Sequence, residues 1–166
     1  MFEIKKTSYK TKTEFYNELN SSLEGLINGE SDWLANISNA AALLYQLMPN
    51  INWAGFYLMK NGELVLGPFQ GKPACIRIPL GKGVCGTAAK TKKTQLVDDI
   101  NKFPGHIACD EISRSEVVVP VIKNDRLIGV LDIDSPLESR FDALDAQGLT
   151  VFVDYLNKYI NWPEQF

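Results

Sequence analysis

Apolar residues recur every three or four positions in two segments near the N-terminus, and this spacing predicts two amphipathic helices. The first helix is expected over residues 13–27, with an apolar stripe formed by Phe15, Leu19, Leu23 and Leu26. The second begins after Ser31 or Asp32, since either side chain can cap a helix, and it ends before Pro49. Its apolar face consists of Trp33, Ile37, Ala40, Leu44 and Leu47. Residues 13–47 are therefore expected to be helical.

Between residues 51 and 135 the pattern changes to short apolar runs, which are typical of strands. Two hairpins are expected, formed by residues 53–59 with 63–66 and by residues 116–122 with 127–134. The first turns at Lys60-Asn61-Gly62, a sequence that favours a tight hairpin, and the second turns within residues 123–126. The shorter elements are strands at 76–78 and 95–97 and a helix at 84–90.

One more helix, capped by Asp142, is predicted over residues 142–160. Its apolar face contains Leu144, Leu149, Phe152, Val153, Leu156 and Ile160. The order of two helices, hairpin-linked strands and a last helix predicts the α+β class, an antiparallel β-sheet flanked by helices. The length of 166 residues fits one domain, 1–166, with the sheet and the functional loops in residues 51–135.

Charge and composition argue against several classes of function. The net charge is −3 and there is no Lys/Arg run, so no nucleic acid is expected as a partner, because phosphates are bound by basic surfaces. No apolar stretch is long enough to cross a bilayer, so no membrane partner is expected either. The N-terminal sequence MFEIKKTSYKTKTEF lacks the apolar core of a signal peptide, which indicates a cytoplasmic protein.

Three cysteines, Cys75, Cys85 and Cys109, are the first candidates for chemistry. An odd number of cysteines in a reducing compartment argues against a structural disulfide framework. There is no CxxC pair and only one histidine, so no metal site is expected. A lone cysteine is commonly a small buried apolar residue, but each of these lies beside small or polar residues in an expected loop or helix start.

Reactivity requires the thiolate form of a cysteine. Backbone N–H groups at a helix start would favour a thiolate at Cys85. The neighbouring Asp110 and Glu111 would disfavour one at Cys109 through like-charge repulsion. The sequence alone therefore leaves open which sulfur is activated.

Two carboxylates interrupt the last predicted strand. Strand alternation places Asp132 and Asp134 on one face, where they are either solvated at the strand end or line a pocket. In a pocket they could hold an ammonium group, or one could act as an acid with a raised pKa. Glu116 joins them if the hairpin has a three-residue loop or a bulge, whereas a plain two-residue loop pairs it with Ile133 on the opposite face. Pro120 cannot donate a ladder hydrogen bond, which favours irregular pairing.

Trp53 and Tyr57 lie four residues apart on a predicted strand and therefore share a face. Core packing is the ordinary interpretation, and an aromatic wall for a small ligand is the alternative. The run Gly81-x-Gly83-x-x-Gly86 has the spacing of a dinucleotide-binding loop. No long βαβ unit follows it, so these glycines are interpreted as tight turns.

Five segments taken together resemble the free methionine-(R)-sulfoxide reductases, a family of single GAF domains. The segments are CIRIP at 75–79, GKGVCGT at 81–87, FPGHIACD at 103–110, SRSEVVVP at 113–120 and GVLDIDSP at 129–136. The resemblance spans about residues 12–160, and it is specific because the wider GAF superfamily lacks this set of cysteines and carboxylates. It implies a GAF-like antiparallel β-sheet flanked by helices.

The resemblance also implies an activity, the reduction of free methionine (R)-S-oxide to methionine in methionine salvage and repair after oxidative stress. Cys109 would attack the sulfoxide and become a sulfenic acid, Cys75 or Cys85 would resolve it as a disulfide, and thioredoxin would restore the thiols. No metal, flavin or nucleotide cofactor is implied. The residues that match the family's substrate-binding acids and aromatic wall are Glu116, Asp132, Asp134, Trp53 and Tyr57.

The chemistry of these residue types agrees with such an activity. A sulfoxide oxygen is a poor leaving group unless it is protonated, and a nearby carboxylic acid can supply the proton. Carboxylates bind an ammonium group through charge-assisted hydrogen bonds, and aromatic rings pack well against an S-methyl group. A resolving cysteine protects a sulfenic acid from further oxidation.

Two other classes of protein are alternatives. Many GAF domains bind small effectors without catalysis, and Asn101-Lys102-Phe103 with Asp110-Glu111 loosely resembles a motif of cyclic-nucleotide GAF domains, although the spacing differs. The second alternative is a structural protein with incidental cysteines, which would lose no thiols on exposure to a sulfoxide. An exposed N-terminal helix could also pair with its own copy to form a homodimer.

Overall fold

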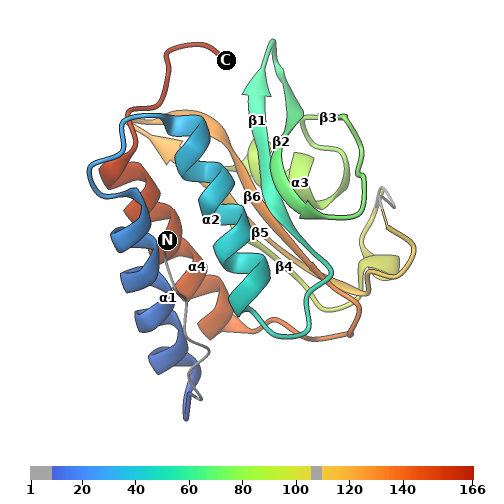
Figure 1. The fold of residues 1–166 in the computed structure, drawn as a ribbon. Coiled ribbons are helices and arrows are strands. Elements are labelled where there is room, and N and C mark those ends of the chain that lie inside the picture. The colour runs from blue at the N-terminus through green and yellow to red at the C-terminus, as the bar shows by residue number, and fades with distance from the viewer. Residues whose placement is uncertain (1–8, 106–109) are drawn as a thin grey trace.

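The computed structural model describes residues 9–105 and 110–166, which form a six-stranded sheet with helices on both faces (Figure 1). The helices are α1 (Lys12–Ile27), α2 (Trp33–Leu47), α3 (Gly83–Thr91), α4 (Ala143–Tyr159) and a short 3-10 helix η1 (Ile100–Lys102). The strands are β1 (Trp53–Lys60), β2 (Glu63–Gly71), β3 (Arg77–Pro79), β4 (Gln95–Val97), β5 (Ser115–Lys123) and β6 (Arg126–Ser135). The predicted α+β class is confirmed. In the described part of the chain, no helix has the length and apolar character that a membrane span requires.

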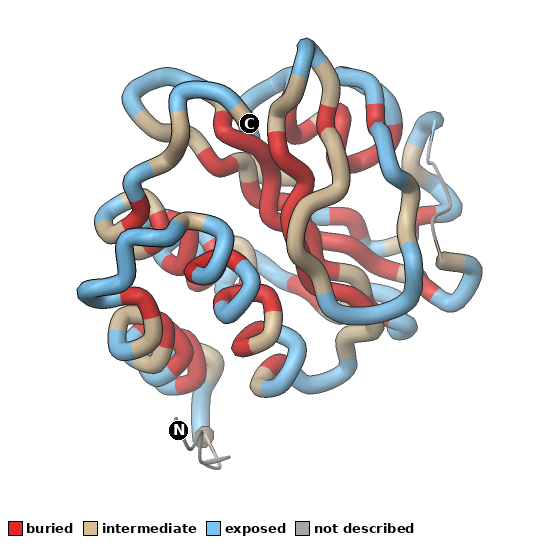
Figure 2. The backbone as a smooth tube through the Cα atoms, turned by 45° about the horizontal axis from the view of Figure 1, so that its top comes forward, coloured by how far each residue is buried: buried red, intermediate tan, exposed pale blue. Residues whose placement is uncertain are grey.

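The strands lie in the order β3-β2-β1-β6-β5-β4, and all neighbouring pairs are antiparallel. Helices α1, α2 and α4 cover one face of the sheet, and α3 lies against the other (Figure 1). The central strands β1, β6 and β5 are therefore covered on both sides. Their interior residues are buried along most of their length (Figure 2).

Each face of the sheet has its own apolar core, as strand alternation requires. On the face of α1, α2 and α4, Phe56, Val117 and Leu131 are each fully buried in a large cluster. On the face of α3, Val118 and Val130 belong to a smaller cluster. The larger core stabilises the sheet, and this leaves the smaller face free to carry polar groups.

The predicted helices are confirmed, with one error in their apolar faces. Leu26 is partly buried and packs against the larger core, and Ile27, which follows it, lies within that core. Leu144 is 48% exposed, because its neighbour Asp145 is the residue that faces α1. The Asp145 carboxyl accepts a hydrogen bond of 2.8 Å from the Tyr16 hydroxyl and completes the capping box of α4. In the first turn of this helix the buried position is therefore occupied by the capping acid Asp145, and the apolar Leu144 faces solvent.

Both hairpins turn through two residues with left-handed backbone conformations. In the first turn these are Asn61 and Gly62, with φ of 50° and 87°, and in the second they are Asn124 and Asp125, with φ of 50° and 61°. Such turns match the twist of antiparallel strands, and Asn, Asp and Gly tolerate them best. The first hairpin is longer than predicted, because β2 continues to Gly71.

Candidate active site

A pocket opens on the face of the sheet that carries α3. About 540 Å³ of space that no protein atom fills lies in and above it, part of it open solvent. Side chains from β1, β5, β6 and the start of α3 form its walls, and the segments around Lys72 and Asp110 border its mouth. The sequence-predicted site residues that line it are Trp53, Tyr57, Cys85, Glu116, Asp132 and Asp134.

The acidic side chains of the pocket meet because the second hairpin contains a bulge. The turn itself has two residues, but the register shifts by one between Val121 and Ile122. Beyond this shift Glu116 pairs with Asp134. Cross-strand partners share a face, so Glu116 lies on the pocket face together with Asp134 and Asp132. Of the two alternatives that the sequence allowed, the bulged hairpin is confirmed.

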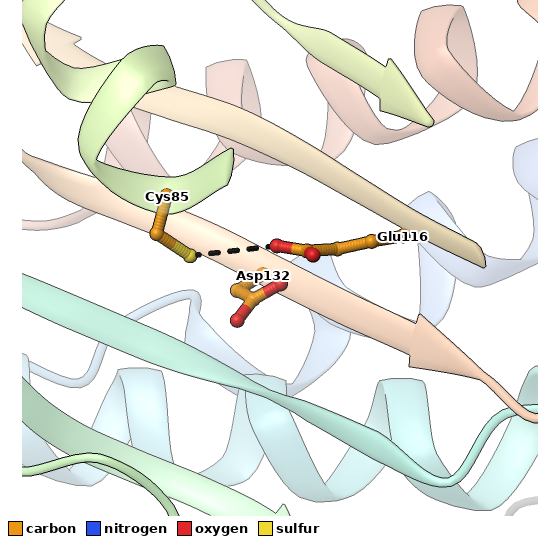
Figure 3. Close-up of side chains that lie close together, drawn as sticks. All are labelled: Cys85, Glu116 and Asp132. Carbon is orange, nitrogen blue, oxygen red and sulfur yellow. Dashed lines mark hydrogen bonds between the residues drawn. The ribbon is translucent and has the colours of Figure 1, made fainter. Parts of the chain in front are cut away.

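Cys85 lies in the first turn of α3 and points toward these acids (Figure 3). Its thiol donates a hydrogen bond to Oε1 of Glu116, with a distance of 3.7 Å between the sulfur and the oxygen. Burial raises the pKa of the Cys85 thiol well above its usual value, and the charges of Asp132 and Glu116 raise it further. The argument that the helix start would favour a thiolate here is therefore wrong, because desolvation and like charge outweigh the backbone N–H groups.

Burial also raises the pKa of all three carboxyl groups. The pKa of Asp132 rises to about 6 because of desolvation. For Glu116 and Asp134 the pKa lies well above the usual value, since the negative charge of neighbouring acids adds to the effect of burial. None of the ion pairs within residues 9–105 and 110–166 involves these carboxyl groups. The pocket therefore contains acids that keep their protons to a higher pH than exposed acids do.

Trp53 and Tyr57 form the aromatic wall of the pocket. Their ring centroids are 5.9 Å apart, and the Phe69 ring also stacks with Trp53, at 5.3 Å. Both interpretations of these residues hold, since they belong to the smaller apolar core and also line the pocket. Phe69 was missed because the predicted strand ended at residue 66, whereas β2 continues through Pro68 to Gly71. The structure tolerates this proline because β3 pairs with β2 only at residues 63–65.

A polar network at the mouth of the pocket was also missed. The Asn52 amide donates hydrogen bonds to Oδ2 of Asp110 at 3.2 Å and to Oγ of Ser113 at 2.9 Å. Lys72 forms an ion pair of 3.3 Å with Asp110. Burial acts to raise the pKa of Asp110, but hydrogen bonds from Ile112, Lys72 and Asn52 outweigh it and hold the pKa below its usual value. These residues come from three distant segments, and no local pattern links them.

The three cysteines have different surroundings. Cys75 is partly buried beside the smaller apolar core and is disulfide-bonded. Cys85 is buried and has a free thiol. Cys109, the sulfur for which the attacking role is predicted, lies outside the described residues. The structure thus brings Cys85 together with the acids, while the redox roles of the cysteines stay predictions.

The glycine run before α3 forms tight turns. Gly81 and Gly83 have φ of 80° and 61°, which glycine adopts without strain. A Cβ on Gly86 would lie 2.4 Å from the carbonyl oxygen of Pro79, so only glycine lets the helix approach β3 this closely. These turns place the first turn of α3, and with it Cys85, against the acids.

Comparisons with known proteins relate this fold and site to a family. A family model described as GAF domain matches residues 37–160. The free methionine-R-sulfoxide reductase of Escherichia coli (strain K12) is 52% identical over 149 residues, which are 90% of each chain. The Saccharomyces cerevisiae protein of the same name is 49% identical over 160 residues, 92% of this chain and 89% of the other. The structure of the Neisseria meningitidis free methionine-R-sulfoxide reductase with its substrate has a TM-score of 0.88 at 44% identity and covers 92% of each chain.

Proposed function

Because the chain belongs to the GAF domain family, and within it to the free methionine-R-sulfoxide reductases, we propose that this enzyme reduces free L-methionine (R)-S-oxide to L-methionine in the pocket of β1, β5 and β6. The observation that carries the proposal is the meeting of three buried carboxyl groups with an aromatic wall in one small pocket. These are the groups that a zwitterionic sulfoxide of this size requires.

The pocket offers a partner for the ammonium group and for the S-methyl group of the substrate. A charged carboxylate binds the ammonium group by charge-assisted hydrogen bonds, and Asp132, with a pKa of about 6, is largely charged at neutral pH. The ring of Trp53, which stacks with Tyr57 and Phe69, packs against the S-methyl group. A methionine residue within a protein chain lacks the free ammonium group, so this pocket favours the free amino acid.

The acids with the most strongly raised pKa supply the proton for the reaction. Burial and the charge of neighbouring acids raise the pKa of Glu116 and Asp134 well above the usual carboxyl value, so both acids hold their protons to a higher pH than exposed acids do. One of them protonates the sulfoxide oxygen as the attacking thiolate forms a bond to the sulfoxide sulfur. The S–O bond then breaks, and the hydroxide released adds to the cysteine sulfur. The bond between the two sulfurs breaks with its electron pair on the methionine sulfur, so methionine leaves and the cysteine becomes a sulfenic acid.

Cys109 is the attacking sulfur in this proposal, and Cys75 resolves the sulfenic acid. The Cys75 thiolate attacks the sulfenic sulfur, a disulfide forms and water is released, and a thioredoxin-type dithiol then reduces the disulfide. Cys75 is favoured over Cys85 because thiol exchange requires a thiolate, and the raised pKa of the buried Cys85 thiol disfavours one. The disulfide-bonded state of Cys75 in the structure supports the same assignment.

The proposal is tested with the reduced protein and each epimer of free methionine S-oxide. Methionine is measured by chromatography in a single turnover, and NADPH oxidation is followed with thioredoxin and its reductase. Only the (R) epimer should react, and Cys109→Ser should form no methionine. Cys75→Ser should form one equivalent of methionine and then stop, whereas Cys85→Ser should still form its disulfide.

Matched variants separate the acids from general effects on the fold. Glu116→Gln should reduce turnover strongly, whereas Asp154→Asn, at an exposed position of α4 on the other face of the sheet, should not. If a folded, reduced protein formed no methionine from either epimer, the proposed function would be wrong and a ligand-sensing role would be favoured. A disulfide that survives in Cys75→Ser but not in Cys85→Ser would reverse the assignment of the resolving cysteine.

A further inference from the structure

Cys85, Glu116 and Asp132 place three metal-ligating atoms on one side of the pocket (Figure 3). One atom from each side chain lies within 4.8 Å of the other two, and the sulfur is 3.7 Å from Oε1 of Glu116. In a tetrahedral zinc site with ordinary bond lengths, a sulfur and an oxygen ligand are about 3.6 Å apart. The three atoms thus need only small movements to share one ion.

One oxygen of this group has no partner in the protein. Oδ1 of Asp132 is buried and makes no hydrogen bond within the described residues, and the whole side chain is only 6% exposed. A buried carboxylate oxygen without a hydrogen bond is uncommon and costly, so it calls for a ligand. The lone pair that a hydrogen bond would use is available to a cation.

The charges around the group favour a cation in the same place. Lys72, at the mouth of the pocket, forms its ion pair with Asp110 rather than with the buried acids. Within the described residues, no Lys or Arg pairs with Glu116, Asp132 or the nearby Asp134. Each buried negative charge here lacks a fixed counter-charge, and a divalent ion would supply one.

From this geometry we propose that Cys85, Glu116 and Asp132 bind a divalent cation of the zinc class, and that the bound ion inhibits the enzyme. One sulfur with two carboxylate oxygens selects zinc, cobalt or cadmium over magnesium and calcium, which prefer oxygen alone. The three ligands lie on the wall of the pocket, so a fourth position faces the substrate volume. The inhibitory part rests on the proposed function, because the ion occupies acids that the sulfoxide needs.

The ligands of this site are present while another cysteine is disulfide-bonded. In the structure Cys75 is disulfide-bonded while the Cys85 thiol is free. The three ligands are therefore present in this disulfide-containing state. An ion bound there acts on the substrate pocket and leaves thiol–disulfide exchange at Cys75 untouched.

Direct binding is tested in the Cys75→Ser/Cys109→Ser variant, where Cys85 is the only thiol of the chain. Titration with Co²⁺ should give a sulfur-to-cobalt charge-transfer band that saturates at one equivalent and that Zn²⁺ displaces. Adding Cys85→Ser should abolish the band. Asp132→Asn should weaken binding by at least about tenfold, since the loss of even an outer partner of a metal ligand costs 10–100-fold. Asp154→Asn, at an exposed position of α4, should change nothing.

Circular dichroism confirms that each variant is folded before it is titrated. The absence of a band, or a band that survives Asp132→Asn and Glu116→Gln unchanged, would overturn the metal site. Inhibition is measured separately in a single turnover of reduced wild-type protein, which needs no thioredoxin. One equivalent of Zn²⁺ should lower the methionine formed at limiting sulfoxide, and excess sulfoxide should restore it. If zinc bound but the amount of methionine formed stayed the same, the inhibitory role would be overturned. If the zinc-free protein formed no methionine, only the proposed function would be contradicted.

Discussion

Replacement of Asp132 by Asn should make the protein more stable at neutral pH while it impairs catalysis. Asp132 is buried, and its pKa rises from 3.8 to about 6 because the charged form is desolvated. Above pH 6 the folded protein therefore contains a carboxylate that would be better solvated in the unfolded chain. Asn has nearly the same shape and no charge, so the substitution removes this penalty without leaving a cavity.

The size of the effect follows from the pKa. A rise from 3.8 to about 6 corresponds to about 3 kcal/mol, at about 1.4 kcal/mol for each tenfold change in proton affinity. The penalty is absent below the unfolded pKa of 3.8 and complete above the folded pKa of about 6, so wild-type stability falls as the pH rises between these values. For a domain of this size, each kcal/mol shifts the melting temperature by about 2–4 °C. At pH 8 the variant should therefore melt up to about 10 °C above the wild type, and the difference should nearly close at pH 4.

Melting is followed by circular dichroism at pH 4, 6 and 8 in a buffer with a chelator, which removes any bound metal. Asp154→Asn is the matched control, because Asp154 is exposed on α4 and lies on the other face of the sheet from the pocket. The control should melt with the wild type at each pH. If Asp132→Asn melted at or below the wild-type temperature at pH 8, the claim that the charged Asp132 carboxylate destabilises the folded protein would be refuted.

Three further substitutions test packing and the pocket. Gly148→Ala should lower the free energy of unfolding by about 1–3 kcal/mol, because a Cβ would lie 2.2 Å from the Tyr16 ring. Gly25→Ala lies at a helix position where a Cβ would meet no other atom, so this substitution should raise the free energy of unfolding by about 0.5–1 kcal/mol. If Gly148→Ala and Gly25→Ala changed the free energy of unfolding in urea equally, the packing argument would be contradicted. Tyr16→Phe removes one hydrogen bond of 2.8 Å from the buried Asp145 carboxyl, which keeps its ion pairs with Lys12 and Arg140. The free energy of unfolding in urea should therefore fall by about 0.5–1.5 kcal/mol with no change in KM, and a variant as stable as the wild type would contradict this. Trp53→Ala should raise KM for the sulfoxide more than it lowers kcat, since the ring binds the S-methyl group, and an unchanged KM would remove Trp53 from the substrate site.

Much of the fold follows from local patterns in the sequence. The helical stripes and the two hairpins appear as periodic apolar residues with turn residues between them. Asp142 caps the last helix as predicted, and of the two candidates for the second helix, Ser31 and Asp32, Asp32 is the cap. The shared face of Asp132 and Asp134 follows from strand alternation alone. These features depend on residues within a few positions of each other, and a single sequence contains that information.

Features that depend on distant residues could not be predicted in the same way. The direction of the pKa shift of Cys85 depends on Glu116 and Asp132, which reach it only after β5 and β6 have paired. The network of Asn52, Asp110 and Ser113 joins segments that are far apart in the chain. In both cases burial and neighbouring charge decide the chemistry, and neither is a property of a local motif.

The position of Glu116 joins these two kinds of information. The turn has two residues, which is one of the alternatives that the sequence left open, and with regular pairing that loop would have aimed Glu116 at the helix-covered core. The extra residue in β6, Ile128, reverses the alternation beyond it, so that Glu116 faces the pocket while Val117 packs in the larger core. Regular pairing would have buried a carboxyl group among α1, α2 and α4 and directed Val117 toward the substrate. The bulge therefore serves fold and function together, because one inserted residue satisfies the apolar core and completes the acidic pocket.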